Sequence, residues 1–127
     1  NSGFYNYDEK GKRNGFWEGI GNNFEILSVQ PDIDIIKDRL ALIQCLEATR
    51  ALESKVLLDI REGDVGAILG WGCIPWAGGP FGWMDLKGAS WVYKKCDEFS
   101  VKFGDRFSAG SLIKKLASEN LSFYEYC

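Results

Sequence analysis

The sequence has 127 residues, a formal net charge of −3 at pH 7 and no histidine. Its length suits one domain with its own core, and 46% hydrophobic with 26% charged residues is an ordinary globular composition. The acidic balance argues against a nucleic-acid partner, which usually requires a basic patch. Without histidine, His-based catalytic triads and Cys/His metal sites are excluded. No apolar run is long enough for a membrane span, and no secretory signal is visible.

The four cysteines, Cys45, Cys73, Cys96 and Cys127, lack the spacing of a zinc knuckle or a redox CxxC motif. A chain with a full apolar core does not need disulfides, so we expect reduced thiols in an intracellular compartment. Cys45 and Cys96 lie in apolar helical stretches and are predicted to fill the core.

Residues 1–31 combine glycine and asparagine with scattered aromatic residues, which indicates a linker that packs through its aromatic side chains. The basic cluster at positions 10–13 lies beside Asp8 and Glu9, which is typical of a solvated turn. The chain begins without methionine in this turn-rich stretch, so we interpret it as a piece of a longer protein. The compact domain is expected to cover residues 32–127.

A long helix is predicted from about residue 33 to 56, because Pro31 and Asp32 form a good helix entry. Apolar residues recur at helical spacing and cover nearly the whole circumference, which predicts burial on more than one side. Glu47 lies on the main apolar stripe. We interpret it as the acidic member of a structural ion pair with Arg39 or Arg50, or as the acceptor of a hydrogen bond from a backbone N–H. The alternative is a general acid or base with a raised pKa.

Three further helices follow. "REGDVGAILGWG" is predicted to be a short helix, with Glu62 and Asp64 near its positive end and Gly70 and Gly72 at its close. "ASWVYKKCDEFSVKFG" is amphipathic and stops at Gly104, and "AGSLIKKLASEN" forms the last helix. No segment alternates long enough to predict a strand. The expected fold is therefore all-α, with one long central helix and several shorter ones.

A corner rich in glycine, proline and tryptophan lies between the predicted helices "REGDVGAILGWG" and "ASWVYKKCDEFSVKFG". Its candidate residues are Trp71, Trp76, Gly78, Gly79, Pro80 and Trp83. One interpretation is a rigid turn, with glycines that permit close backbone approach, prolines that fix the chain and indoles that cover the corner. The other is a pocket for a flat or acyl ligand.

Motifs for self-contained catalysis are missing. The glycines form neither a GxGxxG motif nor a P-loop, and the carboxylate pairs Asp32/Asp34 and Asp97/Glu98 lie at predicted helix ends. We assign no catalytic, cofactor-binding or metal-binding residue.

The motif F-Y-x-Y occurs at residues 4–7 and again at 123–126, which indicates that one complete repeat unit lies between them. Residues 1–31 are then expected to be the tail of a preceding repeat, at 1–16, followed by the linker. Together with the block G-W-G-x-x-P-x-x-G-G-P at residues 70–80, this order of motifs resembles the C-terminal region of 3-hydroxyacyl-CoA dehydrogenases. It is most similar to the second C-terminal helical repeat of the fatty-acid β-oxidation multifunctional proteins. The resemblance covers residues 3–127.

The resemblance implies that the NAD-binding Rossmann domain and the catalytic His-Glu pair belong to another part of the parent enzyme. The family's first repeat carries an Asn-Arg pair whose Asn lines the active site. The matching pair here is Asp38-Arg39, so we transfer no catalytic role.

The function implied by the resemblance is to brace the preceding helical repeat, which faces the Rossmann domain, and to mediate repeat or subunit packing, without catalysis by this fragment alone. The preceding repeat and the Rossmann domain of the parent chain are the expected partners. An acyl-CoA or acyl-chain binding module at the corner is the alternative. The isolated fragment is expected to form a two-fold dimer. Its expected location is the cytoplasm in a bacterium or archaeon, and the mitochondrial or peroxisomal matrix in a eukaryote.

Overall fold

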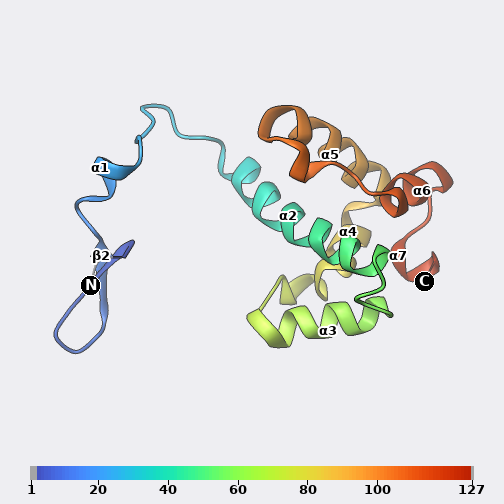
Figure 1. The fold of residues 1–127 in the computed structure, drawn as a ribbon, viewed down its shortest axis with the longest axis horizontal. Helices are drawn as coiled ribbons and strands as arrows, with labels where there is room; N and C mark the ends of the chain where they lie inside the picture. Colours follow the sequence, from blue (N-terminus) through green and yellow to red (C-terminus); the bar gives the residue numbers. More distant parts are fainter. Residues whose placement is uncertain (1–2, 127) are drawn as a thin grey trace. The chain divides into compact units, whose positions relative to one another are not determined.

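The computed structural model describes residues 3–126, which fall into two compact units, 3–31 and 32–126 (Figure 1). The first unit contains β1 (Tyr5–Tyr7), β2 (Arg13–Phe16) and α1 (Ile20–Asn23). The second contains α2 (Ile33–Glu53), α3 (Ile60–Trp71), α4 (Pro80–Lys87), α5 (Ala89–Phe103), α6 (Ser111–Glu119) and α7 (Phe123–Tyr126). Two 3-10 turns, η1 (Pro75–Ala77) and η2 (Asp105–Phe107), join α3 to α4 and α5 to α6.

The first unit is a small antiparallel hairpin, which the sequence did not predict. The side chain of Asp8 accepts the backbone N–H groups of Lys10 and Lys12 at 2.9 and 2.8 Å, and this closes the expected exposed turn. Tyr5 stacks on Phe16 across the strands with ring centroids 5.1 Å apart. A tight turn and one aromatic pair therefore form this hairpin without the alternating pattern of a longer strand.

The second unit is the predicted compact helical domain, and its main helices lie where the sequence placed them. Asp32 caps α2 by accepting the N–H of Asp34 at 2.7 Å. Helix α2 ends at Glu53, three residues before the expected end. Only one of its faces is fully buried, so the prediction of burial on more than one side was wrong. The buried residues are Leu42, Cys45, Leu46 and Thr49.

Short helix α4 shares the centre of the domain with α2, because it contacts α2, α3, α5 and α7. In Figure 1, α3 lies on one side of α2, while α5 and α6 lie on the other. The core is built from aliphatic side chains and several aromatic rings, including Phe81, Trp83, Phe99, Phe107 and Phe123. Cys45 and Cys96 are fully buried, as predicted, and Cys73 is a third free buried cysteine.

Two short helices near the end of the described chain begin at carboxylates from distant elements. Glu53 accepts the N–H of Leu112 at 2.7 Å, at the start of α6. Asp85 accepts the N–H groups of Phe123 and Tyr124 at 2.7 and 3.1 Å, at the start of α7. Burial raises the pKa of Asp85, although these two bonds oppose the shift. Helices this short are unstable alone, so their existence depends on these tertiary contacts.

Candidate functional site

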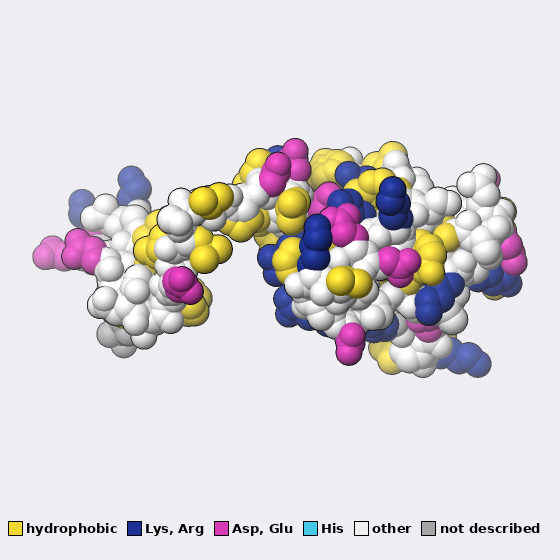
Figure 2. Space-filling model, turned by 90° about the horizontal axis from the view of Figure 1, so that it is seen from above, with side chains coloured by type: hydrophobic (Ala, Val, Ile, Leu, Met, Phe, Trp, Pro, Cys, Tyr) yellow, Lys and Arg dark blue, Asp and Glu magenta, His cyan; other side chains and the backbone are white. Residues whose placement is uncertain are grey.

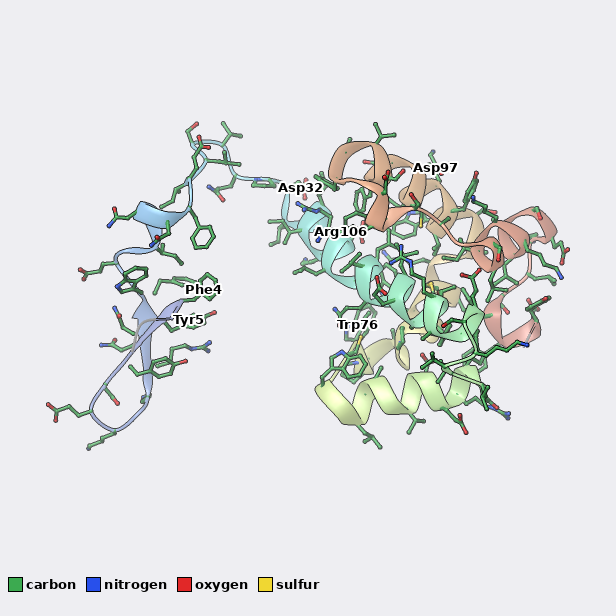
Figure 3. All side chains as sticks on the ribbon, in the orientation of Figure 1. Phe4, Tyr5, Asp32, Trp76, Asp97 and Arg106 are labelled. Carbon is green, nitrogen blue, oxygen red and sulfur yellow. The ribbon has the colours of Figure 1, made fainter. Side chains whose placement is uncertain are left out.

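The three tryptophans of the predicted corner lie in different surroundings. Trp71, the last residue of α3, is 68% exposed, and Trp76 in η1 is 76% exposed. Figure 3 shows Trp76 beside the end of α3. Trp83 is only 2% exposed and packs edge-on against Trp91, with ring centroids 5.9 Å apart. The three indoles therefore do not form one shared cover over the corner: Trp71 and Trp76 are exposed, and Trp83 is part of the core.

The backbone of the corner is tightly constrained. Gly78 and Gly79 have φ values of 82° and 105°, a region that favours glycine. A Cβ atom at Gly79 would stand 2.5 Å from Oδ1 of Asp64, so this position is restricted by space as well as by conformation. Pro80 then occupies the first turn of α4, where its missing N–H costs nothing. This geometry forms a rigid connection between α3 and α4.

Asp64 is the polar centre of the corner, and sequence reasoning missed its role. It is 2% exposed and accepts the N–H groups of Phe81 and Gly82 at 2.8 and 3.1 Å. The Tyr124 hydroxyl donates to it at 2.9 Å. Burial and the adjacent carboxylate raise the pKa of Tyr124 to about 12. Asp64 lies near the positive end of its own helix, as the sequence predicts, but its side chain caps α4.

The sequence did contain a signal for this role. Asp64 lies four residues after Ile60 and three before Ala67, and both of these are buried, so it shares their inward face. The N-cap of α4 is Gly79, which has no side chain to satisfy the first N–H groups of that helix. A buried carboxylate on one helix and an uncapped helix nearby together indicate a capping pair.

An open apolar groove of about 720 Å³ lies between α2 and α3. From α2 and the following loop it is lined by Ile43, Gln44, Glu47, Ala48, Ala51, Val56 and Leu57. From α3 and the corner it is lined by Glu62, Gly63, Gly66, Ala67, Trp71, Cys73 and Pro80. Of the six predicted corner residues, only Trp71 and Pro80 line this groove. The indole N–H of Trp71 donates to Oε1 of Gln44 at 3.1 Å and connects the two walls.

The walls of the groove face solvent. Val56 is 81% exposed, and Trp71 extends from the opposite wall. Cys73 is buried at the groove, and burial raises the pKa of its thiol, which keeps it protonated. The groove therefore offers a wide apolar contact surface with an acidic edge, contributed by Glu47 and Glu62.

The residues considered for catalysis take part in surface contacts. Glu47 forms an ion pair with Arg50, as predicted, but its side chain is 64% exposed, so its expected place on a buried stripe was wrong. Asp38 lies 3.7 Å from Nζ of Lys87. Arg39 stacks on the ring of Phe103, 3.8 Å from its centroid. These contacts position helices.

Charge is mixed over the helical unit. In the view of Figure 2, acidic and basic side chains alternate on its surface with small hydrophobic patches between them. Within residues 3–126, no helix has both the length and the apolarity that a membrane crossing requires.

The fold and the groove together define a small helical domain with an open apolar groove. No family model matches the chain. Its relatives include proteins named fatty acid oxidation complex subunit alpha. The protein from Shewanella oneidensis is 31% identical over 96% of this chain, and that from Vibrio campbellii is 34% identical over 97%. The one from Shewanella amazonensis is 39% identical over 70%.

The chain spans only 17%, 17% and 13% of these three relatives, in that order. The chain is therefore homologous to one segment of the fatty acid oxidation complex alpha subunits, consistent with a C-terminal fragment of such an enzyme. The resemblance drawn from the ordered motifs is thereby confirmed.

Proposed function

We propose that this chain is a helical domain of an NAD-dependent 3-hydroxyacyl-CoA dehydrogenase of fatty-acid β-oxidation. It braces the preceding helical repeat, which faces the Rossmann domain, and carries no reactive group of its own. NAD and the catalytic His-Glu pair belong to the rest of the enzyme. The names of the relatives and the ordered motifs support this proposal. Because the relatives are bacterial, we further propose an intracellular, cytoplasmic location.

The open groove between α2 and α3 carries this proposal. Its lining is largely apolar and its walls are exposed, and apolar surface of this kind marks a contact with another protein surface. A brace must hold its neighbour rigidly, because a displacement of about 1 Å at an active site can cost on the order of 100-fold in rate. The rigid Asp64-capped corner, which forms one end of the groove, suits that role.

The brace can be tested by complementation. A Shewanella oneidensis alpha subunit that lacks the segment matched by this chain should regain dehydrogenase activity when this chain is added, while the chain alone should produce no NADH. Binding without regained activity, or NADH production by the chain alone, would contradict the proposal. In isolation, the chain should cover its groove by forming a two-fold dimer. A monomeric sedimentation profile at high concentration would refute that dimer.

The second candidate function is binding of an acyl chain in the same groove. Its volume of about 720 Å³ lies in the range of small-molecule pockets. Titration with a long-chain acyl-CoA should then give a saturable change in tryptophan fluorescence at micromolar concentration. Because Trp71 lines the groove and Trp76 does not, the change should vanish in Trp71→Phe and persist in Trp76→Phe. A flat titration favours the brace.

A further inference from the structure

Helix α3 contains two glycines that the chain itself does not explain. At Gly63, a Cβ atom would meet Leu57 at 2.6 Å and Phe81 at 2.7 Å, so packing requires glycine there. At Gly66 and Gly70, nothing lies within 4 Å of a Cβ atom, and neither residue has a positive φ. Glycine inside a helix destabilises it relative to alanine. Two such positions therefore weaken α3 with no benefit inside the described chain.

One of these glycines, Gly66, lines the open groove. Gly70 lies one turn later on the same side of α3; it does not line the groove itself, but it stands next to Trp71, which does. Across the groove, α2 also presents small side chains, Ala48 and Ala51. Small residues on a helix let a second backbone approach closely. The groove is therefore shaped for another chain segment that runs beside α3.

The acidic edge of the groove favours an occupant that carries a positive charge. Glu62 stands one turn before Gly66 and has no ion-pair partner among residues 3–126, whereas Glu47 on α2 is paired with Arg50. An occupant with a lysine or arginine beside its apolar face would complement Glu62. The groove also offers no strand edge, since α2 and α3 form its long walls, so an extended segment could not form a ladder of backbone hydrogen bonds there.

We propose that the occupant is an amphipathic α-helix whose backbone packs against α3 at Gly66 and Gly70 and whose basic residue pairs with Glu62. The inference rests on the proposed function, because it takes this helix from the part of the enzyme outside the matched segment. That part makes up more than four-fifths of the relatives' length. A helix about 10 Å wide covers both exposed walls, whereas an acyl chain would leave much of its length in water.

The test uses the Shewanella oneidensis alpha subunit without the 126-residue segment matched by this chain as the binding probe. The double variant Gly66→Ala/Gly70→Ala should melt about 5 °C higher than the parent chain, because alanine favours helix. It should nevertheless bind the probe at least 10-fold more weakly, because two methyl groups block the approach. Glu62→Gln should bind several-fold more weakly and with less dependence on salt.

Val65→Ala is the matched control. Val65 is exposed on α3 but does not line the groove, and its replacement also raises helix propensity. It should leave probe binding unchanged. A rise in melting temperature with loss of binding in the glycine variant alone supports the proposal.

Four outcomes overturn the inference, and the last of them also overturns the proposed function. If the glycine variant binds the probe as the parent does, close approach at α3 is wrong while the brace stands. If it melts lower than the parent, the glycines serve the chain's own fold. If it loses self-association but keeps probe binding, the occupant is a second copy. If the parent chain does not bind the probe at all, the proposed function itself fails.

Discussion

Replacement of Asp64 by alanine removes the buried carboxylate on which the start of α4 depends. The two N–H groups of Phe81 and Gly82 lose their acceptor, and the Tyr124 hydroxyl loses its partner. Each buried N–H left without a partner costs about 1–3 kcal/mol. Phe81 is fully buried, whereas Gly82 and the Tyr124 hydroxyl lie nearer to water. We therefore expect a loss of about 3 kcal/mol in the free energy of unfolding.

Urea unfolding followed by tryptophan fluorescence measures this loss. With a urea dependence of about 1.5 kcal/mol per molar, the midpoint should fall by about 2 M. Asp32→Ala is the matched control, because Asp32 caps the exposed start of α2, where water replaces the lost bond. It should cost only about 1 kcal/mol. Equal losses in the two variants would refute the argument that burial makes the Asp64 cap stronger.

Three further predictions follow from the same part of the domain. Gly79→Ala should destabilise the chain more than Gly72→Ala, because both have positive φ but only Gly79 faces Asp64 at clash distance; equal melting temperatures would contradict this. The raised pKa of Tyr124, about 12, means that its contribution is complete below pH 10 and is lost as the pH rises toward 12. Thermal melts should therefore show a steeper alkaline loss for the parent than for Tyr124→Phe, and parallel curves would disprove it. The raised pKa of Asp85 likewise gives a contribution that is lost as the pH rises above 3.8, the ordinary pKa of an aspartate side chain. Relative to the Asp85→Asn variant, the parent should lose stability as the pH rises through mild acid, as measured by urea midpoints at several pH values; a difference independent of pH would count against it.

Helices were predictable here wherever local signals decided them. Asp32 and Asp59 cap their helices, and Gly72 ends α3 in the left-handed conformation. Contacts between distant residues were not visible in the same way. In the first copy of the motif F-Y-x-Y, Tyr5–Tyr7 form strand β1, whereas the second copy, Phe123–Tyr126, forms helix α7. The second copy is helical because Asp85, 38 positions earlier, accepts its first N–H group.

The groove escaped prediction for a related reason. Apolar residues around α2 indicated burial, but periodicity does not distinguish a face packed within the chain from one left open. The loop between α2 and α3 and the cap at Asp64 decide which face remains open, and both depend on tertiary structure. The tryptophans were likewise assigned to the corner by sequence proximity, whereas η1 turns Trp76 outward and α4 turns Trp83 into the core.

The long-range caps also affect how the domain assembles while the ribosome makes it. The hydrogen bond between Asp85 and Phe123 cannot form until the ribosome has added 38 further residues after Asp85. The bond between Asp64 and Tyr124 requires 60 further residues after Asp64. At about 5–20 residues per second, these intervals last roughly 2–12 s. During that time the Phe81 ring lacks its neighbour Phe123. We expect the nascent chain to pass through a stage in which α4 has been translated but α7 has not. During that stage the ring of Phe81 is exposed, and chaperones compete with α7 for this aromatic surface.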